Sequence, residues 1–481
     1  MKMILSALMI ATVGENVKED KNKSDAQTLS LKALLFCVVS FVVLSALCVS
    51  ALFLSGFVPP QAIINSIVQD YEQIAERGDY PLFFAEAPKY RYDGFTDGIM
   101  LMQSIPDANR SALDNMVLAP YHAIGDGTPG GDGTGGISPT QALLNLLDDP
   151  ENTDQQRQYI LYWHGYVVPM RALLSVFSPM SIIVLNCLTF ALLAVAVFEV
   201  FRRTGGLASA LAFAFALLVS FSWIAPLGFQ FFTMYLIAFL ATLVLYWLLR
   251  RNDRHQWILP LFLTAGLLTA FFDFLTTPLL SFLLPLSLYL LWGIKTQKKD
   301  LFTKTVFAGA AWLVAYAGFW ATKWLLAGVS HGFAYANSEF AYALAQRSGV
   351  GAGGLDYRIA AIYNNLYQLL SPQPDGSLSM GTFFLVLLAV LTLLTLLWLF
   401  FVKKTGTSNS QIQRALPMLL VVAGPYVWYF VVAHHSTFHS WFSYRLQFAS
   451  VLGLLLFIIL SVDWAKLKNK SLLAEPQRKK K

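Results

Sequence analysis

The chain has 481 residues, of which 56% are hydrophobic and only 13% charged, and its mean hydropathy is +0.55. A water-soluble domain has no interior large enough to hide so much apolar surface, so the composition excludes a soluble globular protein and indicates that a lipid bilayer is the solvent. The formal charge of +6 matters less than its distribution, because clusters of Lys and Arg orient membrane segments.

Ten apolar runs predict ten membrane-spanning helices. A spanning helix needs roughly 20 apolar residues because the hydrocarbon core is about 30 Å thick, and a helix satisfies its own backbone hydrogen bonds there. The runs lie at about 33–57, 175–201, 205–223, 229–249, 256–272, 275–293, 305–327, 381–402, 415–433 and 446–462. We therefore expect an all-α, polytopic transmembrane bundle over residues 33–462, preceded by a leader (1–32) and followed by a basic tail (463–481).

Basic clusters accompany alternate connections between these runs. If the N-terminus is cytoplasmic, every inner segment holds a cluster, and together the inner segments hold most of the 34 Lys and Arg residues. Cationic loops stay on the cytoplasmic side, so we predict a multi-pass protein of the plasma (cytoplasmic) membrane with both termini cytoplasmic. Two long segments, 58–174 and 328–380, then lie outside, together with short connections that include 273–277 and 434–445.

The first outer loop, 58–174, changes character, since it carries fifteen acidic and six basic residues from 59 to 174. Apolar residues at helical spacing in 62–74 and 140–147 predict amphipathic helices along the membrane surface. Asp93 and Asp97 stand four residues apart among aromatic residues and glycines. On a helix they would share a face, which suits a general base; alternatively, Asp93 caps a helix and Asp97 is solvated.

Two further parts of this loop carry polar signals. The glycine-rich stretch 125–136 lacks the ending of a phosphate-binding loop and predicts a flexible linker, with a weak calcium site from Asp126 and Asp132 as the less favoured reading. The stretch 162–166 places Tyr and Trp at the bilayer boundary, as interfacial belts do. His164 within it would bind a phosphate or a sugar hydroxyl, or make a structural hydrogen bond.

Asp273 lies in an otherwise apolar hairpin, between the runs 256–272 and 275–293. A charge at such a place is costly unless it faces a cavity or a partner, so the sequence predicts either a site residue or a helix cap.

The connection 434–445 is the densest chemical cluster of the chain, and its main members are His435, His439, Tyr444 and Arg445. This set suits an anionic head group because arginine binds phosphate oxygens with two parallel hydrogen bonds. The competing reading is zinc, since the two histidines are one helical turn apart, but no companion Glu or Cys has ligand spacing. The segment 328–380 is expected to be a plain connecting loop, with a mobile loop over a substrate, beside Arg358, as the alternative.

These features resemble the C-type glycosyltransferase superfamily, whose multi-span members use polyprenyl-phosphate-linked sugars outside the cytoplasmic membrane. The resemblance covers about residues 33–462 and rests on the long first outer loop, the Asp-containing stretch at Thr96-Asp97, and the strings 162–166, 273–278 and 435–445, which look like those of uncharacterised bacterial members. In that family a tight acid pair directly follows the first helix, whereas here it lies some 35 residues downstream. The choice between Asp93 and Asp97 as base therefore stays open.

The resemblance implies a membrane glycosyltransferase that inverts the sugar, with Asp97 as base. It implies that Arg445 and His439 hold the donor phosphate, with Tyr444 and His435 beside them, and that Asp273 and His164 orient the sugar or the acceptor. The implied partners are a polyprenyl-phosphate-linked sugar, an envelope glycan or lipid acceptor and the bilayer, with no nucleic acid. The sequence requires no cofactor, although a divalent cation is compatible with this chemistry. The alternatives are a lipid or glycolipid flippase or transporter and a non-catalytic envelope-assembly protein.

Overall fold

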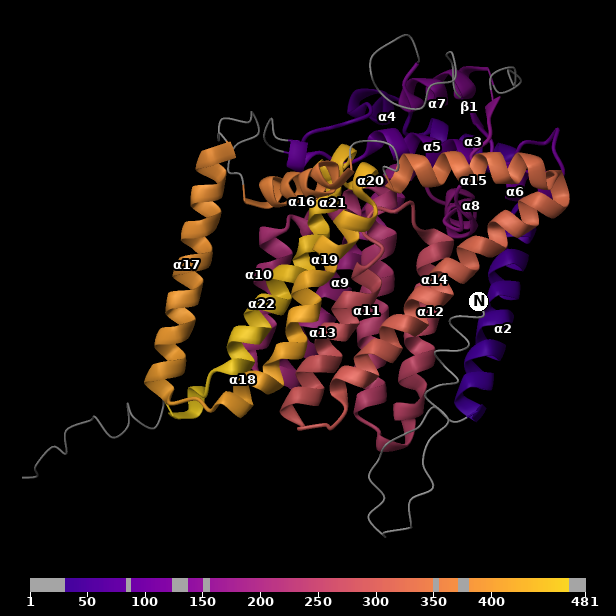
Figure 1. The fold of residues 1–481 in the computed structure, drawn as a ribbon. Coiled ribbons are helices and arrows are strands. Elements are labelled where there is room, and N and C mark those ends of the chain that lie inside the picture. Colours follow the sequence, from indigo (N-terminus) through magenta and orange to yellow (C-terminus); the bar gives the residue numbers. More distant parts are fainter. Residues whose placement is uncertain are drawn as a thin grey trace, which may run out of the picture.

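The computed structural model describes residues 31–83, 88–122, 137–149, 156–348, 354–370 and 380–466. These residues are almost entirely helical, and the one sheet named among them is a short antiparallel pair of β1 (Tyr121–His122) and β2 (Gln156–Arg157). The all-α prediction is therefore confirmed. Long apolar helices form a bundle, and a layer of shorter helices covers one of its ends (Figure 1).

Eight helical segments of the described chain are long and apolar enough to cross a membrane. They are Leu34–Ser55, Pro179–Gly205, Phe229–Leu249, Arg254–Phe272, Leu301–His331, Leu385–Thr405, Asn409–Val431 and Ser440–Ser461. The two remaining expected spans are shorter helices, α10 (Leu207–Val219) and α13 (Leu280–Lys295). Helix length thus supports a membrane protein, whereas a count of ten requires that α10 and α13 also cross.

Each long helix of the bundle runs between the covered end and the opposite end. Its members are α2 (Leu31–Ser55), α9 (Pro179–Gly205), α10, α11 (Phe229–Leu249), α12 (Ile258–Phe272), α13, α14 (Leu301–His331), α19 (Leu419–Val431) and α22 (Phe448–Ser461). Gly266 permits α12 to press against α14, because an added Cβ would lie 2.2 Å from the carbonyl oxygen of Trp312. Small residues at such contacts bring helix backbones close together in lipid.

The first outer loop folds into a helical layer. It contains α3 (Pro60–Val68), α4 (Tyr71–Arg77), η1 (Pro88–Tyr90), α5 (Gly94–Ser104), α6 (Ala112–Leu118), α7 (Pro139–Asp148) and α8 (Val167–Leu174). Surface helices were expected near 62–74 and 140–147, where α3, α4 and α7 now lie. The layer is tied to the bundle by Lys323 of α14, whose Nζ donates to the carbonyl oxygens of Met116 (2.9 Å) and Val117 (2.7 Å).

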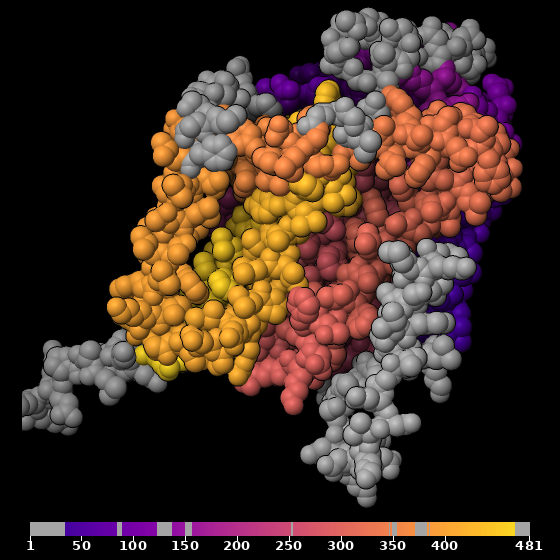
Figure 2. Space-filling view, viewed as in Figure 1, coloured from indigo at the N-terminus to yellow at the C-terminus, as the bar shows by residue number. Residues whose placement is uncertain are grey.

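The second long outer segment is not a plain loop, and that prediction is wrong. It holds α15 (Phe333–Ser348) and α16 (Gly354–Leu370), which cross the covered end of the bundle (Figure 1). Figure 2 shows α16 above the yellow helices of the C-terminal part, and Figure 1 shows α15 to its right, above α14. The apolar periodicity of α16 buries Ala361 and Asn365 against its neighbours, so packing rather than composition decides the segment's structure.

The remaining elements connect these parts. They are η2 (Ser222–Leu227), η3 (Asn252–Trp257), α17 (Met380–Thr405), α18 (Asn409–Ala415), η4 (Leu416–Met418), α20 (Ala433–Phe438), α21 (Ser440–Ser443) and η5 (Tyr444–Gln447). The N-terminal leader up to residue 30, the glycine-rich stretch 125–136 and the tail from residue 467 lie outside the described residues.

Candidate functional site

The two carboxylates of the first outer loop lie at the start of α5. Asp93 is its N-cap: Oδ1 accepts from the Thr96 amide (2.9 Å) and Oδ2 from the Thr96 hydroxyl (2.7 Å). Asp97 follows in the first turn, and its side chain is not solvated, since the residue is only 7% exposed. Of the two readings, capping by Asp93 is therefore correct, but solvation of Asp97 is wrong.

Asp97 caps a second helix instead of its own. Its Oδ1 accepts hydrogen bonds from the backbone amides of Phe229 (3.0 Å) and Gln230 (3.4 Å), the first residues of α11. The amides at a helix N-terminus have no intrahelical acceptor and carry partial positive charge, so they stabilise a carboxylate. Gly228 leaves room beside the other oxygen, because an added Cβ would lie 3.5 Å from Oδ2 in ordinary contact.

Burial dominates the protonation of both acids. It raises the pKa of Asp93 to about 6, against the opposing hydrogen bonds from Thr96. Burial also raises the pKa of Asp97 well above its ordinary value, and the negative charge of Asp93 adds to that rise, while the amides of Gln230 and Phe229 oppose it. Two interacting acids with raised pKa values make a pair that holds a proton near neutrality, which is what acid–base chemistry requires.

The segment 273–277 lies between α12 and α13 and is joined to Asp97 through Gln230. The Gln230 side-chain amide donates to the Thr276 hydroxyl (2.9 Å), and the Thr276 backbone amide donates to Asp273 Oδ1 (3.0 Å). Asp273 Oδ2 and Gln230 Oε1 are buried without a hydrogen-bond partner among the described residues. Burial raises the pKa of Asp273 to about 7. Asp273 therefore closes the turn before α13 rather than capping that helix, whose N-cap is Leu279, and one of its oxygens stays open.

Arg445 approaches the same place from η5. Its Nη2 donates to the backbone carbonyls of Lys89 (3.2 Å) and Arg91 (3.0 Å), just before Asp93. Its guanidinium carbon lies 4.8 Å from the ring centroid of Phe231, the residue after Gln230. Arg445 is 1% exposed, yet its Nε and Nη1 have no hydrogen-bond partner in the described part of the chain. Tyr444 beside it donates its hydroxyl to the same Lys89 carbonyl (3.2 Å).

The histidines of α20 lie on the other side of the segment 273–277. His435 Nε2 is 3.0 Å from the carbonyl oxygen of Leu275, and its Nδ1 is buried without a partner within the described residues. His439 stacks near His435, with ring centroids 4.6 Å apart, and on Phe442. Burial lowers the pKa of His435 and lowers that of His439 to about 3. Both rings are therefore neutral near pH 7, so they supply hydrogen bonds rather than positive charge.

His164 lies in an aromatic cluster behind Asp273. Its Nε2 bonds the Tyr159 carbonyl oxygen (2.6 Å), and its ring lies 5.3 Å from that of Phe274. Its Nδ1 is 3.3 Å from the Tyr166 hydroxyl, which itself donates to Gln103. Burial lowers the pKa of His164 to about 3. The structural reading of this histidine therefore fits its surroundings better than a charged phosphate ligand does.

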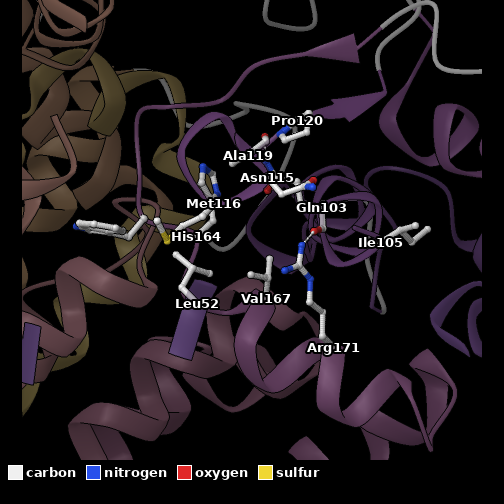
Figure 3. Close-up of a pocket in the computed structure, with 11 residues that line it drawn as sticks. Leu52, Gln103, Ile105, Asn115, Met116, Ala119, Pro120, His164, Val167 and Arg171 are labelled. Atoms are coloured by element: carbon white, nitrogen blue, oxygen red, sulfur yellow. Dashed lines mark hydrogen bonds between the residues drawn. The ribbon is translucent and has the colours of Figure 1, made fainter. Parts of the chain in front are cut away.

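Beside His164 lies an enclosed cavity of about 10 Å³ that holds one water at most. Figure 3 shows Arg171 reaching across it toward Gln103, and Arg171 Nη2 donates to the Gln103 carbonyl (3.0 Å). This cavity is far too small for a sugar, so it has a structural rather than a substrate-binding character.

Backbone strain accompanies these contacts. His164 (φ 54°) and Leu275 (φ 66°) both adopt the left-handed conformation, which is costly for residues other than glycine. Gly165 allows the approach of the two segments, because its amide donates to the Phe271 carbonyl (2.8 Å) and an added Cβ would lie 2.4 Å from the Phe271 ring. Strained residues persist where the surrounding packing holds them, and they cluster at functional sites.

The structure therefore gathers Asp93, Asp97, Asp273 and Arg445 around the first turn of α11. No hydrogen bond or ring contact among the described residues joins His439 to Arg445: His439 stacks on Phe442, whose ring lies 5.4 Å from that of Phe231, the ring beside Arg445. His164 is not part of this group either, and its ring lies 5.3 Å from that of Phe274.

Two residues that sequence reasoning passed over belong to these surroundings. Gln230 joins two of the acids, and its signal was an isolated amide at the start of an apolar run. The guanidinium carbon of Arg347 in α15 lies 5.9 Å from the Tyr162 ring centroid. Its positive charge adds to the lowering of the pKa of His435 and of His439. Nothing in the sequence around Arg347 indicated that α15 would fold over the site.

Within the described residues no three His, Cys, Asp or Glu side chains lie close enough together to hold a metal ion. No known family model matches the chain, and neither a curated protein nor a solved structure shows significant similarity to it.

Proposed function

We propose that this chain is a membrane glycosyltransferase that moves a sugar from a polyprenyl-phosphate donor to a cell-envelope acceptor on the outer face of the cytoplasmic membrane, with both termini inside. The observation that carries the proposal is a set of open polar atoms at one end of an apolar bundle. Asp273 Oδ2, Gln230 Oε1, His435 Nδ1 and Arg445 Nε and Nη1 are all buried, and none has a partner among the described residues.

Such atoms are costly unless something binds them. A buried polar group without a hydrogen bond destabilises the folded state by about 1–3 kcal/mol, and a charged group by more. The open atoms around the first turn of α11 include an acceptor of Asp273, an acceptor of Gln230 and two donors of Arg445. A phosphorylated sugar offers hydroxyl donors to Asp273 and Gln230 and phosphate oxygens to Arg445, so it suits the whole set.

In the proposed reaction Asp97, Arg445 and Asp273 each have one role. The acceptor hydroxyl attacks the anomeric carbon as the bond from that carbon to the phosphate oxygen breaks, which inverts the configuration. Asp97 takes the hydroxyl proton, and the bonding electron pair leaves with polyprenyl phosphate. Arg445 stabilises the leaving phosphate through Nε and Nη1, because preorganised charge acts strongly where water is excluded. Asp273 orients the sugar.

Asp97 is favoured over Asp93 as the base. Both oxygens of Asp93 are engaged by Thr96 in the cap of α5, whereas the hydrogen bonds that Asp97 receives from α11 fall on Oδ1. Gly228 leaves space next to Asp97 Oδ2. A raised pKa makes a carboxylate a stronger base once it is ionised.

The donor's lipid chain needs an apolar surface that reaches the covered end of the bundle, and α17 offers one. Figure 1 shows α17 standing apart from the rest of the bundle. It is joined near its ends, where Phe383 contacts Tyr363 of α16 and Trp398 donates to Ser461 of α22 (2.9 Å). None of its most apolar stretch is buried within the protein. A polyprenyl chain in the bilayer would lie along such a helix through van der Waals contacts, because both surfaces are already out of water.

The test is Asp97→Asn in cells that lack the native chain. The amide oxygen of Asn still accepts from the Phe229 and Gln230 amides, so insertion and folding are retained, while the base is lost. We expect sugar transfer to fall roughly 100-fold or more and the polyprenyl-linked sugar to accumulate, both measured by mass spectrometry of envelope extracts.

Asp70→Asn is the matched control. Asp70 is equally buried in the same outer layer, and its Oδ2 accepts from the Met180 amide at the start of α9 (2.7 Å). We expect this variant to transfer sugar normally. Full transfer by the Asp97→Asn variant would discard the assignment. Purified wild-type protein that binds the donor but never releases polyprenyl phosphate would favour a flippase or an assembly protein instead.

A further inference from the structure

A second feature lies at the opposite end of the bundle. A cavity of about 490 Å³ opens between the last residues of α9, α11 and α13, and it is lined by Arg203, Thr204, Tyr246, Leu249, Arg250, Trp292, Lys295 and Thr296. Because Asp97 caps the N-terminus of α11 and this helix has 21 residues, the cavity at its other end lies about 30 Å from the acids. That distance is close to the thickness of the hydrocarbon core.

We propose that this cavity binds the phosphate head group of an anionic phospholipid from the leaflet opposite the candidate active site. The lining described above contains three cations and no acid. Arg250 donates to the Tyr246 hydroxyl (3.2 Å), and Arg203 interacts with the same oxygen. Two guanidinium groups therefore converge on one neutral oxygen, while Lys295 Nζ donates to the Gly205 carbonyl (3.3 Å).

Glu199 of α9 pairs with one of these cations but does not neutralise the set. Glu199 receives hydrogen bonds from both Arg202 (2.5 Å) and Arg203 (2.6 Å), so one carboxylate is shared between two cations. Arg250 and Lys295 have no ion pair within the described residues. An anion entering the cavity would satisfy them, and the volume lies in the range of ordinary ligand sites, roughly 300–1,000 Å³.

A lipid fits the surroundings better than a free anion. An exposed apolar stripe of α11, formed by Leu240, Val244 and Trp247, begins one residue from Tyr246. An acyl chain along this stripe would place its phosphate beside Arg250, at the depth where Tyr and Trp side chains lie in membrane proteins. Basic pockets between spanning helices bind anionic head groups in this manner.

The experiment measures thermal unfolding of the full-length protein in detergent, titrated with phosphatidylglycerol, phosphatidylcholine or inorganic phosphate. We expect stabilisation by phosphatidylglycerol alone. The variant Arg250→Gln with Lys295→Gln should need about tenfold more of this lipid for half of the effect, because each basic residue contributes to head-group binding. The control, Arg251→Gln with Lys299→Gln, removes the same charge from exposed residues outside the cavity lining and should behave as wild type.

Native mass spectrometry of the same variants counts the bound lipids directly and does not depend on their stability. Equal loss of phosphatidylglycerol in both double variants would overturn the cavity as the site. Equal stabilisation by inorganic phosphate and phosphatidylglycerol would overturn the lipid assignment.

Discussion

Single residues around the first turn of α11 hold the fold and, under the proposed function, also take part in the chemistry. Asp97 anchors α5 to α11 through Oδ1, while its other oxygen borders the space that Gly228 leaves. Arg445 anchors the segment before Asp93 through Nη2, while Nε and Nη1 remain open. When some polar atoms of a side chain are fixed by hydrogen bonds to the backbone, its remaining polar atoms point in a defined direction. Less conformational entropy is then lost when a substrate binds.

The pH dependence of transfer tests the coupling between the two acids. Asp97 must be ionised to act as a base, so the rate rises with pH as its proton is lost. Asp93→Asn keeps the cap, because Asn also serves as an N-cap, but removes the charge that raises the pKa of Asp97. We expect the acid limb of the pH–rate profile to move to lower pH in this variant. An unchanged limb, or a move to higher pH, would show that the two carboxylates are not coupled.

At the scale of elements, buried cations tie the outer layer to the membrane helices. Arg171 of α8 donates to the carbonyls of Ser104 (3.1 Å) and Gln103 (3.0 Å) at the end of α5 and to the hydroxyl of Ser55 (3.0 Å) at the end of α2. Burial lowers the pKa of Arg171 to about 10, which still leaves it charged at neutral pH. One side chain thus joins three helices, and the position of Asp97 on α5 depends on it.

Arg171→Met should weaken this junction. The substitution fills similar volume but leaves three acceptors without their donor, so we expect the free energy of unfolding to fall by roughly 3 kcal/mol or more. Thermal unfolding of the purified protein would measure the loss. Arg110→Met is the control, since Arg110 is 28% exposed and pairs with Asp107 at the surface, where an ion pair contributes about 0–1 kcal/mol. Equal losses in the two variants would contradict the proposed role of Arg171.

The whole molecule separates its two polar ends. The candidate active site lies under the helical layer, and the basic cavity lies at the other ends of the same helices. The positive-inside rule predicts that the basic end is cytoplasmic and therefore that the acids face outward. A donor whose sugar has already reached the outer leaflet would then meet the site directly, which is what transfer to an envelope acceptor requires.

Cysteine labelling tests this arrangement. Ala108 in the outer layer and Lys298 after α13 are both exposed, whereas Cys37 and Cys48 are buried and Cys187 is half-buried. A membrane-impermeant maleimide should label Ala108→Cys in intact cells and Lys298→Cys only after the membrane is opened, with the parent chain as background. Labelling of both positions from one side would contradict the separation of the two ends.

How much the sequence predicted differs between the fold and the site. Apolar runs of about 20 residues predicted helices because the bilayer leaves the backbone no other partner, and the helices were found at those places. The segment 328–380 was misjudged because its apolar residues, although periodic in α16, gain their stabilising contacts only when the helices pack over the bundle. The shortness of α10 and α13 was also missed, because the flanking residues are apolar whether or not they are helical.

By itself, the sequence determined that the chain is helical, that a bilayer is its solvent and that its acids and its basic clusters belong to different segments. Each of these follows from composition and spacing along the chain. Only the tertiary structure decided which of the polar residues meet. Asp97 caps α11 from 132 residues away, and Arg445 contacts the backbone 354 residues before it, because helix packing rather than proximity in sequence determines such pairs.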